Sequence, residues 1–147
     1  MPRLSLMKVR PANRADQREL ARMLEALNPH DDFDRLAEVR TWRTGAFVVD
    51  RGGGRLGGFI HVGTRSYAEG ATESPVAFVE EWFVDRDLRR SGHGRSLMRA
   101  AEQWARQRGH RQLASDTPLK NRRSQRAHGR LGFRVAEKLV SFIKELR

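Results

Sequence analysis

Residues 88–98 read LRRSGHGRSLM, a stretch in which three arginines flank two glycines. An apolar run at residues 76–84 precedes it, and apolar residues at helical spacing follow it from Leu97 to Ala105. This order predicts a strand that passes through a glycine-containing turn into a helix. Because the N-terminus of a helix offers free N–H groups and a partial positive charge, the turn is predicted to bind an anion such as a phosphate.

The composition is typical of a chain that folds as one domain around one core. It has 147 residues, of which 38% are hydrophobic, and no apolar run long enough to span a membrane. The first twenty residues lack the apolar centre of a secretory signal, so we expect a cytoplasmic protein. Because cysteine is absent, disulfides, thiolate metal sites and a cysteine nucleophile are excluded. The five histidines lack metal-ligand spacing, and we expect no metal.

The net charge of +11 is concentrated in one segment. Residues 86–134 carry fourteen Lys and Arg against three Asp and Glu, whereas residues 1–85 are close to neutral. Such a segment is typical of proteins with a phosphate-bearing partner, either nucleic acid or a cofactor. Its arginines are not interleaved with exposed aromatic residues, so nucleic acid is the remote alternative and we expect no such partner.

Hydrophobic periodicity predicts an α/β domain with a mixed sheet, in the order β-α-α-β-β-β-α-β-α-β-β. The strands are expected at residues 4–9, 46–50, 56–62, 76–84, 112–116, 133–135 and 139–143. The helices are expected from Asn13 to Leu27, within residues 33–42, from the quoted turn to Gly109, and from Asn121 to Leu131. The strand at 76–84 is apolar on both faces, which indicates a central position in the sheet.

Three kinds of glycine loop compete for the basic turn. The Walker pattern GxxxxGK[ST] is absent, and the dinucleotide pattern GxGxxG fails because Leu97 stands at its third glycine. The third pattern, RxxGxG from Arg89 to Gly94, resembles the pyrophosphate loop of the GNAT superfamily of acetyl-CoA-dependent N-acetyltransferases. Downstream, NxxS from Asn121 and the helix end LGF at 131–133 are similar to the superfamily's second cofactor motif.

The resemblance to GNAT enzymes implies a fold and a set of cofactor contacts. It implies a mixed, mostly antiparallel sheet, flanked by about four helices, whose fourth and fifth strands splay apart around acetyl-CoA. The backbone N–H at a bulge in the fourth strand, that of Val84, would polarise the thioester carbonyl. The residues implied in cofactor binding are Trp82, Phe83, Val84, Arg89, Arg90, Ser91, Gly92, His93, Gly94 and Asn121.

One branch of the superfamily, the aminoglycoside 6′-N-acetyltransferases, is a closer match. The segments TESPVAFVEEWFV (72–84) and LASDTPLKNRRSQRAHGRLGF (113–133) look like the corresponding segments of that branch. The resemblance implies acetyl transfer to an aminoglycoside, antibiotic resistance and a homodimer. The implied catalytic residues are Glu80, Asp116 and Val84, and the implied substrate-binding residues are His30, Tyr67, Glu80, Asp116 and Glu137. A polycationic substrate needs such carboxylates, and one of them is the natural base for its ammonium group.

Several departures from the branch pattern bear on substrate and mechanism. Asn28-Pro29 stands where the branch has a tryptophan, and His93-Gly94 stands where Val-Ala is common. Glu81 replaces a glycine, and Phe142 occupies a position often filled by tyrosine, which removes a candidate general acid. Another amine acceptor therefore stays open as an alternative, whether a polyamine, another small molecule or a protein amine.

The adjacent carboxylates of Glu80 and Glu81 are unusual within an otherwise apolar strand, because unpaired buried carboxylates are costly. In a regular strand the two side chains would point to opposite faces of the sheet. If both have a structural role, one of them would pair with a neighbouring arginine and the other would lie at a solvated bulge.

Overall fold

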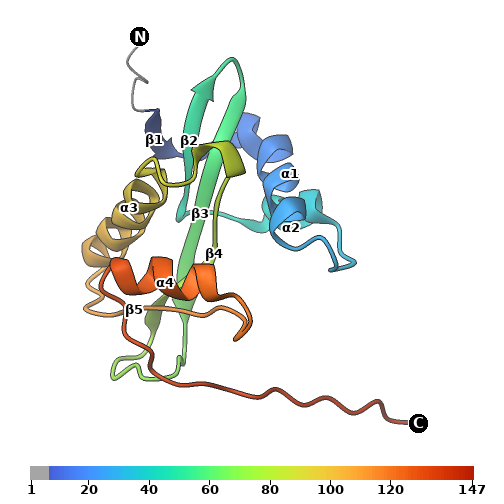
Figure 1. Cartoon of the computed structure of the whole chain (residues 1–147), viewed down its shortest axis with the longest axis vertical. Coiled ribbons are helices and arrows are strands. Elements are labelled where there is room, and N and C mark those ends of the chain that lie inside the picture. Colours follow the sequence, from blue (N-terminus) through green and yellow to red (C-terminus); the bar gives the residue numbers. More distant parts are fainter. Residues whose placement is uncertain (1–6) are drawn as a thin grey trace.

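The computed structural model describes residues 7–147, and a five-stranded sheet in the order β1-β2-β3-β4-β5 forms its centre (Figure 1). The strands are β1 (Lys8–Pro11), β2 (Ala46–Gly52), β3 (Arg55–Arg65), β4 (Val76–Val84) and β5 (Leu113–Ser115). The first four strands pair antiparallel, and β5 runs parallel to β4. The predicted mixed, mostly antiparallel sheet is thus confirmed, although residues 4–6 of the first predicted strand lie outside the described residues.

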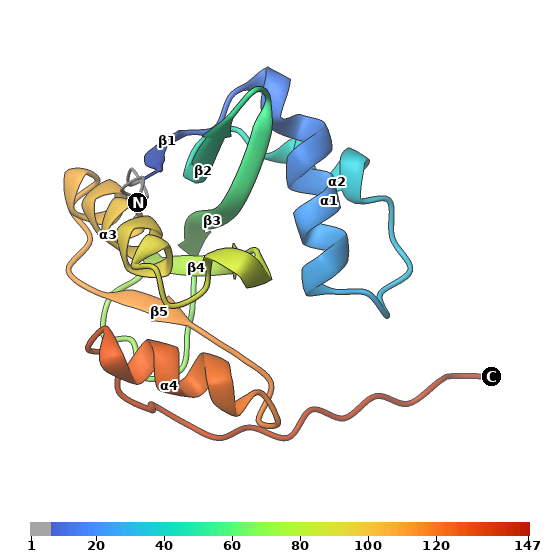
Figure 2. The ribbon, with the colours of Figure 1, turned by 45° about the horizontal axis from the view of Figure 1, so that its top comes forward.

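Helices cover both faces of this sheet (Figure 2). On one face lie α1 (Gln17–Leu27) and α2 (Arg35–Thr41), on the other lies α3 (His93–Gln107), and α4 (Arg122–Arg130) lies beside β5. Two single-turn 3-10 helices, η1 (Arg14–Asp16) and η2 (Arg86–Leu88), precede α1 and α3. Within residues 7–147, the helices are all too short or too polar to cross a membrane.

Alternating residues of the sheet supply the two larger of three hydrophobic clusters, one on each face. Phe59 of β3 packs with Leu24 of α1, whereas the next residue, Ile60, packs with Leu97 of α3. This alternation follows from the two-residue period of a strand. The prediction that the strand at 76–84 is central is confirmed, because β4 pairs with β3 on one side and with β5 on the other.

The two strands predicted after α4 do not form. From residue 133 the chain carries no regular secondary structure, and it leaves the domain as an extended segment that ends far from the sheet (Figure 2). Phe133 is still half-buried against the core on the α3 side, but the large apolar side chains beyond it are at least 63% exposed: Val135, Leu139, Val140, Phe142, Ile143 and Leu146. The prediction was wrong because this segment, despite its alternating apolar residues, does not pair with any strand of the described chain.

Candidate functional site

The strands β4 and β5 diverge after a short stretch of pairing. Only Ala77, Phe78 and Val79 of β4 pair with β5, and the ladder ends at Ser115. In the described chain, the β5-facing backbone edge of residues 80–84 therefore has no strand partner. A free strand edge binds an extended ligand through backbone hydrogen bonds, so this opening suits the arm of a long cofactor.

A β-bulge lies in β4 at Glu80. Glu81 pairs with His61 and Val79 pairs with Val62, which leaves Glu80 as an extra residue on its strand. Val79 packs on the α3 side of the sheet, and beyond the bulge Phe83 packs on the α1 side. Alternation from both ends therefore places Glu80 and Glu81 on the same face, that of α1 and α2. The opposite-face arrangement expected of a regular strand is overturned.

The position of the bulge also bears on the predicted role of Val84. Val84 pairs in regular register with Gly58, four residues beyond the bulge. The prediction that the Val84 N–H polarises a thioester assumed a bulge at that residue, and this assumption was wrong. The backbone edge near Glu80 to Trp82 has the irregular geometry that the prediction placed at Val84.

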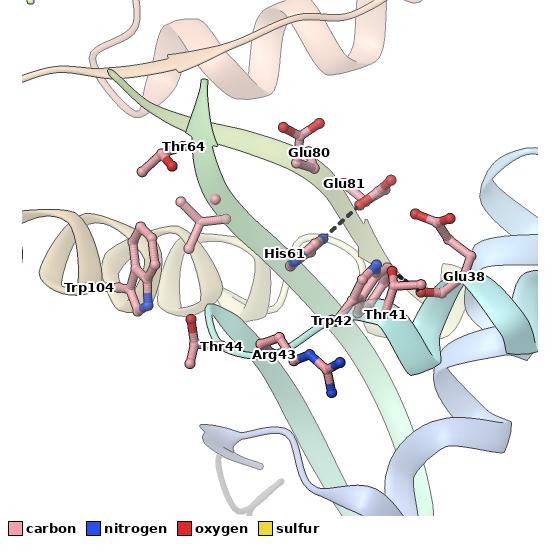
Figure 3. Close-up of a pocket in the computed structure, with 12 residues that line it drawn as sticks. Glu38, Thr41, Trp42, Arg43, Thr44, His61, Thr64, Glu80, Glu81 and Trp104 are labelled. Carbon is pink, nitrogen blue, oxygen red and sulfur yellow. Dashed lines mark hydrogen bonds and ion pairs between the residues drawn. The ribbon is translucent and has the colours of Figure 1, made fainter. Parts of the chain in front are cut away.

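Both glutamates line an open pocket of about 410 Å³ between α2 and the sheet (Figure 3). Its charged lining residues are Glu38, Arg43, Glu80 and Glu81, and its aromatic ones include Trp42 and His61. Three carboxylates against one arginine are unusual on a chain of net charge +11. The pocket is therefore suited to a cationic ligand.

Glu80 is held by an arginine that the sequence did not single out. Arg65 donates to Glu80 twice, from Nε to Oε1 at 2.9 Å and from Nη2 to Oε2 at 2.6 Å. The guanidinium also lies 3.6 Å from the ring centroid of Phe78. These hydrogen bonds to Glu80 raise the pKa of Arg65, as does the nearby charge of Asp116. Glu80 is thus held by Arg65, whereas Asp116 is exposed directly after β5 and is not a lining residue of the pocket.

The other predicted substrate residues lie outside the pocket. Tyr67 is 66% exposed in the β3–β4 loop and donates from Oη to Glu69 at 2.8 Å. A hydrogen bond between Glu69 and Glu137 raises the pKa of Glu137 and lowers that of Glu69. Tyr67 and Glu137 therefore form one acidic cluster with Glu69, which the sequence analysis had not identified. His30 is exposed in the α1–α2 loop.

The turn from Arg89 to Gly94 has the backbone shape of an anion-binding loop. Gly92 caps α3 with a φ of +87°, a left-handed conformation that favours glycine. Ser91 contacts both the Leu88 carbonyl and Nδ1 of His93, so its hydroxyl serves the turn itself. His93 is buried, and its Nε2 has no hydrogen-bond partner within residues 7–147.

Positive charges converge at the same place. Arg89 donates from Nε to the Val84 carbonyl at 3.2 Å, which anchors its guanidinium at the end of β4. Burial lowers the pKa of Arg89, and the charges of Arg123 and Arg86 lower it further. Arg123 lies in the first turn of α4, which Asn121 caps by accepting from the Ser124 N–H at 3.0 Å. Convergent unpaired cations favour an anion between them.

These features fit a cofactor with a phosphate end and an extended arm. The first turn of α3 and the arginines around Arg89 suit the phosphates, and the free edge of β4 suits the arm. The buried, unpartnered Nε2 of His93 lies in the same turn. Asn121 caps α4 through its oxygen, and its amide N–H groups are available to a ligand.

His128 is a residue of this opening that the sequence analysis missed. Its Nε2 lies 2.8 Å from Ser115 Oγ, and its Nδ1 lies 2.7 Å from the Ser124 carbonyl oxygen. The ring packs edge-on against Trp82, with centroids 5.2 Å apart. His128 thus joins β5, α4 and β4 where the strands part. Its only sequence signal is a histidine within a helix that otherwise carries mainly arginines and small residues.

Within residues 7–147, no group of three or more His, Cys, Asp or Glu side chains has the arrangement of a metal site.

Comparisons with known proteins bear on both the fold and the site. Residues 12–133 match the model of the "Acetyltransferase (GNAT) family". An aminoglycoside N(6′)-acetyltransferase type 1 of Stenotrophomonas maltophilia is 34% identical over 138 residues, with 91% of this chain and 90% of the relative covered. The enzyme of that name from Serratia marcescens is 38% identical over 139 residues, covering 80% of this chain and 95% of the relative.

A solved structure is similar over nearly the whole chain. It is that of AAC(6′)-Iy in complex with a bisubstrate analogue, CoA-S-monomethyl-acetylneamine. The TM-score is 0.87 at 30% sequence identity, and the alignment covers 97% of this chain and 100% of the other.

Proposed function

The chain belongs to the acetyltransferase (GNAT) family, and we propose that it transfers the acetyl group of acetyl-CoA to the 6′-amine of an aminoglycoside. One observation carries the choice of acceptor. On a chain of net charge +11, the bulge in β4 sets Glu80 and Glu81 side by side over a pocket, next to the free edge of the same strand. A polycationic amine is attracted to the place where an acyl group bound along β4 would end.

We infer the cofactor contacts from the opening between β4 and β5. The free edge of Trp82, Phe83 and Val84 would hold the extended arm, and the amide of Asn121 would lie across from it. The turn of Arg89, Arg90, Ser91, Gly92, His93 and Gly94 would hold the pyrophosphate. When bound, acetyl-CoA supplies an acetyl group activated as a thioester. Backbone N–H groups on the free edge are the donors available to an acyl oxygen. We also propose that the protein acts in the cytoplasm.

The acceptor is proposed to lie along the carboxylates of the α1–α2 face. Amines with a pKa near that of lysine are protonated at pH 7, so carboxylates must hold an ammonium group that later loses a proton. Glu80, which Arg65 holds, and Asp116, which directly follows the last paired residue of β5, are the proposed contacts nearest the reaction. Tyr67, Glu137 and His30 are proposed contacts for the more distant amines of the substrate.

Thiol release from acetyl-CoA tests this function directly. Neomycin has an amine at the 6′ position and paromomycin has a hydroxyl, so turnover with neomycin alone is expected. Equal turnover with both would contradict 6′-acetylation while leaving an aminoglycoside acetyltransferase. No turnover with either, with CoA still bound, would contradict the choice of acceptor. Glu80→Gln and Asp116→Asn are expected to raise KM for neomycin more than KM for acetyl-CoA.

We also propose a homodimer in which the extended segment of residues 134–147 packs on a second copy of this chain. Six large apolar side chains of this segment are exposed, and exposed apolar patches of this kind mark interfaces. The outer edge of β5 has no partner strand within residues 7–147, and an extended segment pairs readily with such an edge.

The test of the dimer is sedimentation equilibrium of the full chain and of the Phe142→Ser, Ile143→Ser double variant. Both residues are 91% exposed in the single chain, so the variant is expected to fold normally, which circular dichroism checks. The full chain is expected to sediment as a dimer and the variant as a monomer. A monomeric full chain would overturn the proposal.

A further inference from the structure

The acidic pocket contains an imidazole that the proposed function leaves unused. Nδ1 of His61 lies 3.3 Å from Oε2 of Glu81, as the dashed line in Figure 3 marks. The His61 ring stacks on Trp42, with centroids 4.1 Å apart and planes inclined by 20°. The two side chains of the pair are only 15% and 21% exposed. Trp42 therefore fixes the plane of the imidazole, and Glu81 fixes its rotation within that plane.

This contact determines which imidazole nitrogen is available to a ligand. An ionised carboxylate only accepts hydrogen bonds, so Nδ1 of His61 carries a proton and donates to Glu81. In the neutral ring, Nε2 then keeps a lone pair. It has no hydrogen-bond partner within residues 7–147, and it is not among the fully buried unpaired atoms of that range, so it is open to the pocket.

The carboxylate of Glu80 is less suited to accept a proton. Both of its oxygens already accept hydrogen bonds from Arg65, and a proton on either would break that ion pair. Glu81 makes no such contact with an arginine in the described chain, and its hydrogen-bonded neighbour is His61. The bulge at Glu80 is what brings Glu81 to this face of the sheet, opposite His61.

We propose that His61 is the general base of acetyl transfer and that Glu81 is the residue that positions it, an inference that rests on the proposed function. Nε2 of His61 takes one proton from the acceptor ammonium. The amine lone pair then forms the C–N bond as the C–S bond breaks, and the second amine proton leaves with the thiol. His61 returns its proton to solvent, so one acetyl group is transferred and one proton is released.

The tautomer of His61 gives a test that does not depend on turnover. Nitrogen-15 NMR of the full-length protein is expected to show that His61 is the Nδ1–H tautomer. The His61 signals are assigned as those that disappear in the His61→Gln variant. In Glu81→Leu, which removes the acceptor, that tautomer is expected to give way to the Nε2–H form. An Nε2–H tautomer in the wild type, or no change in Glu81→Leu, would overturn the proposal.

The kinetic test is the pH profile of neomycin acetylation. His61→Gln is expected to lower kcat roughly 100-fold or more at pH 7 with little change in KM, which is the range for a general base. Its rate should rise with pH toward that of the wild type, because solvent then supplies the neutral amine. The charged groups that face the pair are Glu80, Glu38 and Arg43, and Arg65 is bound to Glu80.

Glu38→Gln is the matched control, since it removes one carboxylate from the same pocket without a contact to His61. It is expected to raise KM for neomycin and to leave the His61 tautomer and the pH profile unchanged. If the wild type acetylates neomycin and the His61→Gln variant has a normal kcat, the role of His61 is overturned and the proposed function stands. A wild type that acetylates no aminoglycoside would instead overturn the proposed function, whatever the tautomer.

Discussion

Asp16 shows how a single buried charge is tolerated in this chain. It is one of two buried polar residues in the described chain, and Arg10 donates to it from Nη1 and Nη2 at 2.8 and 2.9 Å. The N–H of Asn13 donates to it as well, at 2.8 Å. Burial acts to raise the pKa of Asp16, but these hydrogen bonds outweigh it, and the pKa lies below its usual value.

We expect Asp16→Asn to lower the free energy of unfolding at pH 7 by about 2 kcal/mol, because Arg10 loses its charged partner. A carboxyl group whose pKa is lowered by folding stabilises the fold above its unfolded pKa, near 3.9, and loses this effect as the pH falls through its folded pKa. The difference between wild type and variant should therefore shrink as the pH falls below about 4. Urea unfolding at a series of pH values measures it, with exposed Asp31→Asn as the control. A difference that is constant with pH would contradict the assignment.

Only part of the candidate site could be predicted from the identities of its residues. Glu80 could be predicted because it lies at a fixed distance from the SPV segment of a motif. Arg65 and His61 could not, because their importance comes from partners across the sheet: Arg65 meets Glu80, and His61 meets Glu81. No pattern along the chain indicates such pairs.

At the scale of elements, the bulge in β4 is expected to be required for activity and dispensable for folding. Deleting Glu80 keeps the pairs of Glu81 with His61 and of Val79 with Val62, but it makes the ladder regular. We therefore expect a Tm equal to or above that of the wild type, with acetyl transfer reduced by at least 100-fold, because carboxylates no longer gather on the α2 face. Differential scanning calorimetry and thiol release measure the two effects.

Glu80→Ala is the control for the deletion, since it removes the carboxylate and keeps the extra backbone residue. It should retain more activity than the deletion. If the deletion variant were as active as Glu80→Ala, the geometry of the bulge would have no role beyond that of the side chain.

Local patterns predicted most elements and missed the features that depend on distant partners. The strand at 76–84, the basic turn and α3 follow from residue spacing alone, and all three form where expected. The bulge could not be predicted, because register is a property of two strands and β3 decides it. The two final strands were predicted from alternation, yet residues 134–147 are extended and unpaired in the single chain.

At the scale of the whole molecule, opposite charges are separated between two ligand sites. Arg86, Arg89 and Arg123 lie near one another by the end of β4, whereas carboxylates line the pocket under α2. An anionic cofactor and a cationic acceptor are therefore each attracted to a different side of β4. The strand itself is where the two ligands meet.

This separation makes the binding of CoA dependent on ionic strength. Raising NaCl from about 50 to 500 mM shortens the Debye length from over 10 Å to under 5 Å, so CoA affinity, measured by calorimetry, should fall steadily. Arg89→Ala is expected to weaken CoA binding roughly 10-fold or more at low salt and to flatten this dependence, because it removes a charge from the convergent group. Arg40→Ala, an exposed arginine in α2, is the charge-matched control and should leave both quantities near those of the wild type. Equal behaviour of the two variants would mean that the net charge attracts the cofactor, and that the turn from Arg89 to Gly94 has no special part in holding it.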